Sequence, residues 1–169
     1  MTRTSLDHHN CSFARTVDII GDHWSLMILR DAFYGVRRFS QFKRDLGVTQ
    51  AVLSSRLTSL VEHGLLSREP IGTDKAREEY RLTTRGRDLF PVVVSLMQWG
   101  DRWLHHETGA PVILTDSQSG VAIDRIEVSA GGLPRRPECL SFSPGPGATP
   151  ETANILRQAN VRNLAGSGQ

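Results

Sequence analysis

The stretch that most restricts the fold of this chain is FSQFKRDLGVTQAVLSSRLTSLVEHGLL, residues 39–66. Its apolar spacing predicts a short helix over residues 40–46, a glycine break, and a second helix from about residue 50 to residue 63. Thr49 is a good N-cap for the second helix, and Gly64 supplies the left-handed residue that can end it. Two helices joined by a short turn containing glycine form the helix-turn-helix unit, although helical hairpins that bind no nucleic acid share this pattern.

The second of these helices has an unusual polar face. At 100° per residue its leucines form one buried stripe, and the opposite side carries small and hydroxylated residues with almost no acid. Such a face fits a major groove, where Gln50 can pair with adenine and Arg56 can contact either guanine or a phosphate. We expect six residues to face or flank the groove: Thr49, Gln50, Ala51, Ser55, Arg56 and Ser59.

Basic residues gather around the same unit, although the net charge of the chain is only +2. Phosphate attraction acts over about a Debye length, so a local basic patch is sufficient for DNA binding. We expect Arg37, Arg38 and Lys43 to contact the DNA backbone. On charge alone, an ordinary solvated face is the alternative.

A β-hairpin is predicted directly after the second helix. Two extended runs, residues 67–71 and 79–82, flank a polar tip at residues 72–77. Lys75 and Arg77 in this tip can reach a phosphate or enter the minor groove. Solubilising charge on a turn is the alternative interpretation of these two residues.

Helices are also predicted on both sides of this region. Residues 12–21 form a short helix, and Asp22 can cap a second, largely apolar helix over residues 23–34 that we expect in the core. After the hairpin, Thr83 can cap one long helix over residues 84–107, with a kink near Pro91.

The apolar surface of that long helix is too wide for a single packing partner, so we expect an isologous dimer. The predicted interface residues are Phe90, Val93, Met97, Trp99 and Trp103. A cofactor site lined by Trp99 and Trp103 is the alternative, but we expect no cofactor.

Taken together, the segments CSFARTVDIIGDHW, RRFSQF, LSSRL, LVEHGLL, YRLT and QWGDRW resemble the HxlR-type winged helix-turn-helix regulators of bacteria. The resemblance covers residues 11–103. It implies a mainly α fold with a small β-hairpin wing, and a homodimer that binds a pseudo-palindromic operator in double-stranded DNA. We expect a repressor in the bacterial cytoplasm, associated with the nucleoid.

Several members of that family sense oxidants or electrophiles through a cysteine just before the first helix, and Cys11 occupies this position. Cys11 is therefore the redox-sensor candidate. A packing role is a second interpretation, and a metal site with His8, His9 and a histidine of 105–106 is a third. The spacing HHxC does not supply a tetrahedral zinc site, so we expect no metal.

The character of the chain changes near residues 108–111, after which glycine and proline cluster. We expect a winged-helix and dimerisation domain over 1–108, a short irregular or β extension over 109–145, and a tail over 146–169. Short strands are predicted at 112–114 and 121–128, and a helix at 151–164.

Several other functions are disfavoured by the sequence. No apolar run approaches the roughly 20 residues that span a bilayer, so no membrane partner is expected. No nucleophile–histidine–acid set and no phosphate-binding glycine loop is recognisable, so we expect no enzyme. Two alternatives remain: a small-molecule inducer bound near the dimer helices and the extension, and a winged-helix protein-interaction module that binds no DNA.

Overall fold

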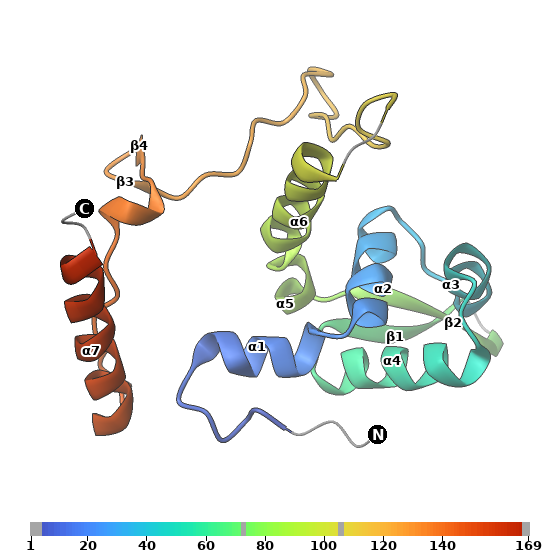
Figure 1. Cartoon of the computed structure of the whole chain (residues 1–169). Helices are drawn as coiled ribbons and strands as arrows, with labels where there is room; N and C mark the ends of the chain where they lie inside the picture. The colour runs from blue at the N-terminus through green and yellow to red at the C-terminus, as the bar shows by residue number, and fades with distance from the viewer. Residues whose placement is uncertain (1–4, 72–73, 105–106, 167–169) are drawn as a thin grey trace. The chain divides into compact units, whose positions relative to one another are not determined.

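The computed structural model describes residues 5–71, 74–104 and 107–166. The chain separates into two compact units, one formed by residues 19–126 and the other by residues 1–18 with 127–169. The larger unit holds a bundle of short helices and a two-stranded hairpin (Figure 1). The expected boundary at 108–111 falls inside this unit, and the division into three domains stays a prediction.

The first two helices are α1 (Ser12–Ile20) and α2 (His23–Phe33), as the sequence predicted. The Asp22 carboxylate caps α2 by accepting hydrogen bonds from the backbone N–H groups of Trp24 and Ser25. Ile28, Leu29 and Ala32 of α2 are fully buried, so this helix forms the centre of the core.

The predicted helix-turn-helix unit is confirmed as α3 (Phe39–Leu46) and α4 (Gln50–Glu62). The hydroxyl of Thr49 accepts a bond from the Val52 N–H and caps α4. At the other end Gly64 has a φ of +67°, and the Leu65 N–H donates to the carbonyl of Leu60 at 2.9 Å. This Schellman geometry turns the chain from α4 into the hairpin.

The hairpin consists of β1 (Leu66–Ile71) and β2 (Asp74–Leu82), paired antiparallel with Leu66 opposite Leu82. β2 begins at residue 74 and not at residue 79, so the tip is shorter than predicted. An Arg68–Glu78 ion pair crosses the strands in the added part. Cross-strand charge pairs support pairing that apolar alternation does not reveal.

The expected long helix is instead two helices, α5 (Thr84–Arg87) and α6 (Phe90–Trp103). The helix is interrupted at residues 88–89, both of which keep right-handed helical backbone angles, so the kink predicted near Pro91 takes the form of a break between two helices. Pro91 then lies in the first turn of α6, where a missing N–H leaves no hydrogen bond unmade. Thr83 caps α5, as predicted, by accepting from the Gly86 N–H.

The extension after α6 is irregular. The strands predicted at 112–114 and 121–128 do not form in this described segment, where one isolated bridge joins Thr115 and Ala122. The side-chain amide of Gln98 on α6 instead binds the segment, donating to the Asp124 carbonyl and accepting from the Ile126 N–H. A side chain of α6 therefore takes the place of a second strand.

The smaller unit contains the two-residue strands β3 (Ser129–Ala130) and β4 (Leu133–Pro134), a 3₁₀ turn (Pro137–Cys139) and α7 (Pro150–Gly166). The helix expected at 151–164 is thus confirmed. Over the described parts of the chain, no helix is long and apolar enough to cross a membrane.

Candidate nucleic-acid interface

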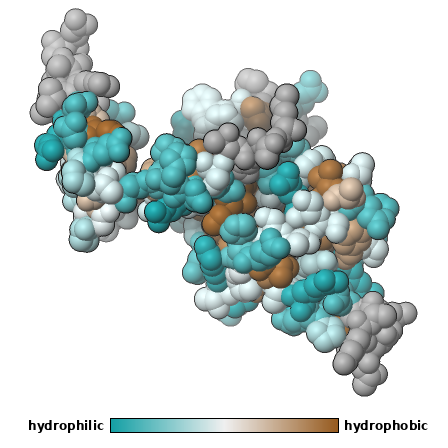
Figure 2. Space-filling view, turned by 90° about the horizontal axis from the view of Figure 1, so that it is seen from below, coloured by the Kyte–Doolittle hydropathy of each residue, from teal (hydrophilic) through white to brown (hydrophobic). Residues whose placement is uncertain are grey.

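The polar face of α4 lies on the surface of the larger unit. Leu53, Leu57 and Leu60 are at most 1% exposed and hold the helix to the core. Of the six predicted groove residues, Thr49, Gln50, Ala51 and Ser55 are exposed, and Arg56 and Ser59 are partly exposed. The view from below in Figure 2, the side on which α4 lies in Figure 1, shows a mostly hydrophilic and neutral surface with small apolar patches.

Three of these six side chains have partners among the described residues, one of them the Thr49 hydroxyl that caps α4. The Arg56 Nε lies 3.2 Å from the Asp22 Oδ1. The Ser59 hydroxyl lies 3.4 Å from the Nδ1 of His63, one turn further along α4.

The basic residues before and on α3 have different environments. The Arg37 guanidinium donates to the carbonyls of Ala32 and Val36, at 2.6 and 3.0 Å, and so caps the C-terminal end of α2. Arg38 is largely exposed, with its Nε 3.9 Å from a Glu79 carboxylate oxygen, and Lys43 is also exposed. The side chains of Lys75 and Arg77 lie outside the described residues.

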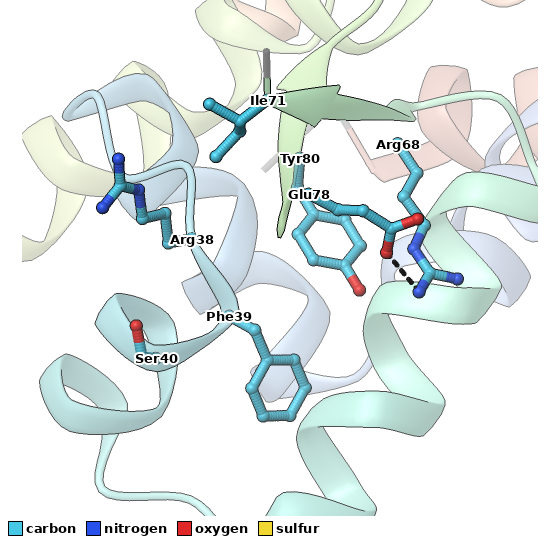
Figure 3. A pocket seen from close by; sticks show the side chains of 7 residues that line it. All are labelled: Arg38, Phe39, Ser40, Arg68, Ile71, Glu78 and Tyr80. Atoms are coloured by element: carbon cyan, nitrogen blue, oxygen red, sulfur yellow. Dashed lines mark ion pairs between the residues drawn. The ribbon is translucent and has the colours of Figure 1, made fainter. Parts of the chain in front are cut away.

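A groove of about 590 Å³ separates the start of α3 from the hairpin (Figure 3). Arg38 and Arg68 stand on its opposite walls, and the Arg68–Glu78 ion pair closes one side. Its lining residues are Arg38, Phe39, Ser40, Arg68, Ile71, Glu78 and Tyr80. Burial raises the pKa of Tyr80 above its usual value, the nearby Arg68 opposes this and Glu78 adds to it.

The sequence predicted Arg38 as a contact to the DNA backbone and did not single out Arg68 or Tyr80. Those two residues face each other across the hairpin, in a register that strand propensity does not give. The predicted hairpin wing was the only feature of the sequence that pointed to Arg68 and Tyr80.

Hydrogen bonds join the wing to the helix-turn-helix unit. The Tyr80 N–H donates to the Arg37 carbonyl at 2.8 Å, between α2 and α3. At the base of the hairpin the Thr83 hydroxyl donates to the Gly64 carbonyl, at 2.6 Å, just after α4. The wing is thus tied through Tyr80 to the segment before α3, and through Thr83 to the end of α4.

Much of the apolar face of α6 is left uncovered by the part of the chain that the structure describes. Trp99 and Trp103 are each 56% exposed, and Phe90 is 38% exposed. Val93 is only 6% exposed, so its inclusion in the predicted interface is corrected: it is a core residue of this chain, because it faces inward beside Val94. Met97 is partly buried.

Cys11 is an exposed thiol in the smaller unit, as is Cys139. It lines a pocket of about 380 Å³ beside the start of α7. The neighbouring Asn10 side chain donates to the Gly147 carbonyl and accepts from the Thr149 N–H and the Thr152 hydroxyl. No group of three or more potential metal ligands occurs in the described ranges, which exclude residues 105–106.

In this chain α3 and α4 form a helix-turn-helix, α4 is exposed and poor in acidic residues, and a hairpin wing follows it. This arrangement defines the class of winged helix-turn-helix DNA-binding proteins. Residues 19–108 match the family of the HxlR-like helix-turn-helix, which is more than half of the chain. The chain belongs to this family, as its sequence motifs predicted. It is a DNA-binding transcriptional regulator of the helix-turn-helix type, and the proteins of this family are not enzymes.

Relatives and solved structures agree with this assignment. The chain is 45% identical to the HTH-type transcriptional regulator Rv3095 of Mycobacterium tuberculosis over 137 residues, 80% of this chain and 87% of the relative. The crystal structure of the candidate transcription factor PA1607 has a TM-score of 0.77 and 40% identity, covering 83% of this chain and 99% of that one. The reduced form of the redox regulator HypR has a TM-score of 0.51 and 31% identity, covering 56% and 96%.

Proposed function

We propose that this regulator is a homodimer that represses transcription by placing two copies of α4 in adjacent major grooves of a pseudo-palindromic operator. The observation that carries this proposal is the exposed face of α4, which presents Gln50, Ala51 and Ser55 on a helix that has no acidic residue before Glu62. Residues of this kind suit base edges and thymine methyl groups. Arg38 and Lys43 flank them as phosphate contacts.

A titration of DNA binding against salt tests these assignments. Lys43→Gln is expected to lower the slope of log affinity against log salt by about one and to leave sequence preference unchanged. Gln50→Ala is expected to weaken discrimination at one base pair of each half-site, by about 1–3 kcal/mol. Equal affinity of the wild-type chain for its own upstream region and for unrelated DNA would exclude sequence-specific binding.

We further propose that an oxidant or electrophile acting on Cys11 releases the DNA. Two observations support this: the thiol is exposed, and it adjoins Asn10, whose side chain holds the start of α7. The likeness to HypR, described as a redox regulator, favours the same role. Cys11→Ser is expected to keep operator binding and lose release by diamide, with Cys139→Ser as the matched control; full release of the Cys11→Ser variant would contradict the proposal.

A small-molecule inducer is the second candidate effector. It is favoured by a groove of about 160 Å³ between α6 and the irregular segment, lined by Val94, Met97 and Ile123 among others. Release of DNA by a ligand that acts equally on wild-type and Cys11→Ser protein would favour this candidate. A protein of this function would act in the bacterial cytoplasm.

A further inference from the structure

Arg56 is the one arginine of α4, and the sequence left it a choice between guanine and a phosphate. In the structure it has a third kind of partner. Its Nε lies 3.2 Å from the Oδ1 of Asp22, and the side chains of the pair are 38% and 16% exposed. The Nε atom itself is buried. The charge of Arg56 is therefore already balanced by a carboxylate before any DNA is bound.

The Asp22 carboxylate is held in place independently of Arg56. It caps α2 by accepting from the N–H groups of Trp24 and Ser25, each at 3.1 Å, and its second oxygen accepts from the Ser25 hydroxyl. Ser25 is 1% exposed. Among the described residues, Arg56 is the partner of this carboxylate that comes from outside the α2 cap, so the pair fastens α4 to a rigid point at the start of α2.

The position of Arg56 on α4 determines which motion of the helix this contact restrains. In the sequence, Arg56 falls between the buried Leu53 and Leu57 and directly follows the exposed Ser55. On the helix surface it therefore lies on the flank, between the buried stripe and the exposed face. Leucine packing holds α4 against the core, but apolar contacts are not directional. An ion pair on the flank restrains rotation of the helix about its own axis, and this rotation decides which side chains point into the groove.

We infer that Arg56 is a positioning residue, which through Asp22 fixes the rotation of the recognition helix and contacts neither a base nor a phosphate. The inference rests on the proposed reading of DNA by α4 and assigns one of its residues a different task. The Nε has no well-aligned hydrogen bond, so the attraction is mainly between charges. A lysine at position 56 should therefore retain part of the effect.

The test is a double-mutant cycle of Asp22→Asn and Arg56→Gln, measured as operator affinity over a range of salt concentrations. Asn at position 22 keeps the capping oxygen and removes only the charge. Both single variants and the double variant are expected to lose affinity by a similar factor, about three- to tenfold, because each removes the same pair. The salt slope and the base preference should remain those of the wild-type chain, and Arg56→Lys should retain more affinity than Arg56→Gln.

Circular dichroism at the assay temperature separates positioning from unfolding, since a fully folded variant with weakened affinity has lost more than stability. Lys43→Gln is the control, because this exposed lysine of α3 makes no ion pair within the described part of the chain and should lower the salt slope by about one. A similar fall in slope for Arg56→Gln, a lost preference at one base pair, or wild-type affinity of Asp22→Asn would each overturn the inference. A wild-type chain without sequence preference would instead refute the proposed function, on which the inference depends.

Discussion

At the scale of single residues, the sequence predicted helix caps correctly but did not predict ion pairs between residues that are far apart in the chain. Asp22 and Thr49 were identified as helix caps because a cap and its helix are adjacent in sequence. The pairing of Asp22 with Arg56 joins residues 34 positions apart, and no periodicity reports such a contact. Arg37 differs in that its partners, the Ala32 and Val36 carbonyls, are close in sequence, but the basic composition of the region indicated only a phosphate contact and not these bonds.

Gly86 gives a prediction at this scale. A Cβ at this position would lie 2.1 Å from the Leu65 carbonyl oxygen, and the neighbour is backbone that cannot swing aside. Gly86→Ala is expected to lower the free energy of unfolding by about 1–3 kcal/mol in urea titrations. Gly100→Ala is the control, because the nearest atom to its added Cβ is 3.8 Å away and alanine favours a helix. Equal stability of the two variants would contradict the close approach of α5 to the end of α4.

At the scale of elements, periodicity and caps predicted α1 to α4, the wing and α7, each within a few residues. Two errors have physical causes. Pro91 was taken as an interior kink, although proline is equally compatible with the first turn of a new helix. The apolar runs after residue 111 were taken as strands, but Gln98 and an Asp116 turn satisfy part of their backbone instead.

The turn at Asp116 should respond to acid. Its carboxylate accepts from the backbone N–H and the hydroxyl of Ser119 and from the Gln118 N–H, which together hold the pKa of Asp116 below its usual value. A carboxyl with a lowered pKa stabilises the folded turn above its unfolded pKa, and this contribution is lost as pH falls through the folded pKa. The amide proton of Ser119, followed by NMR, is expected to titrate with a midpoint below that of an ordinary aspartate. A midpoint at or above the ordinary value would show that the turn does not form.

At the scale of the whole molecule, the uncovered face of α6 is the basis for the proposed dimer. Trp99 and Trp103 expose more than half of their surface, which is costly for side chains of this size in water. Trp99→Glu is expected to shift the protein to a monomer in analytical ultracentrifugation and to weaken operator binding. Ile155→Glu on α7 is a matched control, since Ile155 is exposed to a similar degree, 58%. An unchanged dimer in the Trp99→Glu variant, or a monomeric wild type, would place the uncovered tryptophans outside any subunit interface.

The central claim is that α4 reads DNA sequence as one half of a symmetric pair, and selection of binding sites from random duplexes tests it most directly. The proposed function predicts that the wild-type chain enriches an inverted repeat with half-sites about one helical turn, or a multiple of it, apart. The Gln50→Ala variant should enrich the same repeat with one position of each half-site relaxed. Enrichment of no sequence, or an identical preference after Gln50→Ala, Ser55→Ala and Ser59→Ala combined, would contradict the claim.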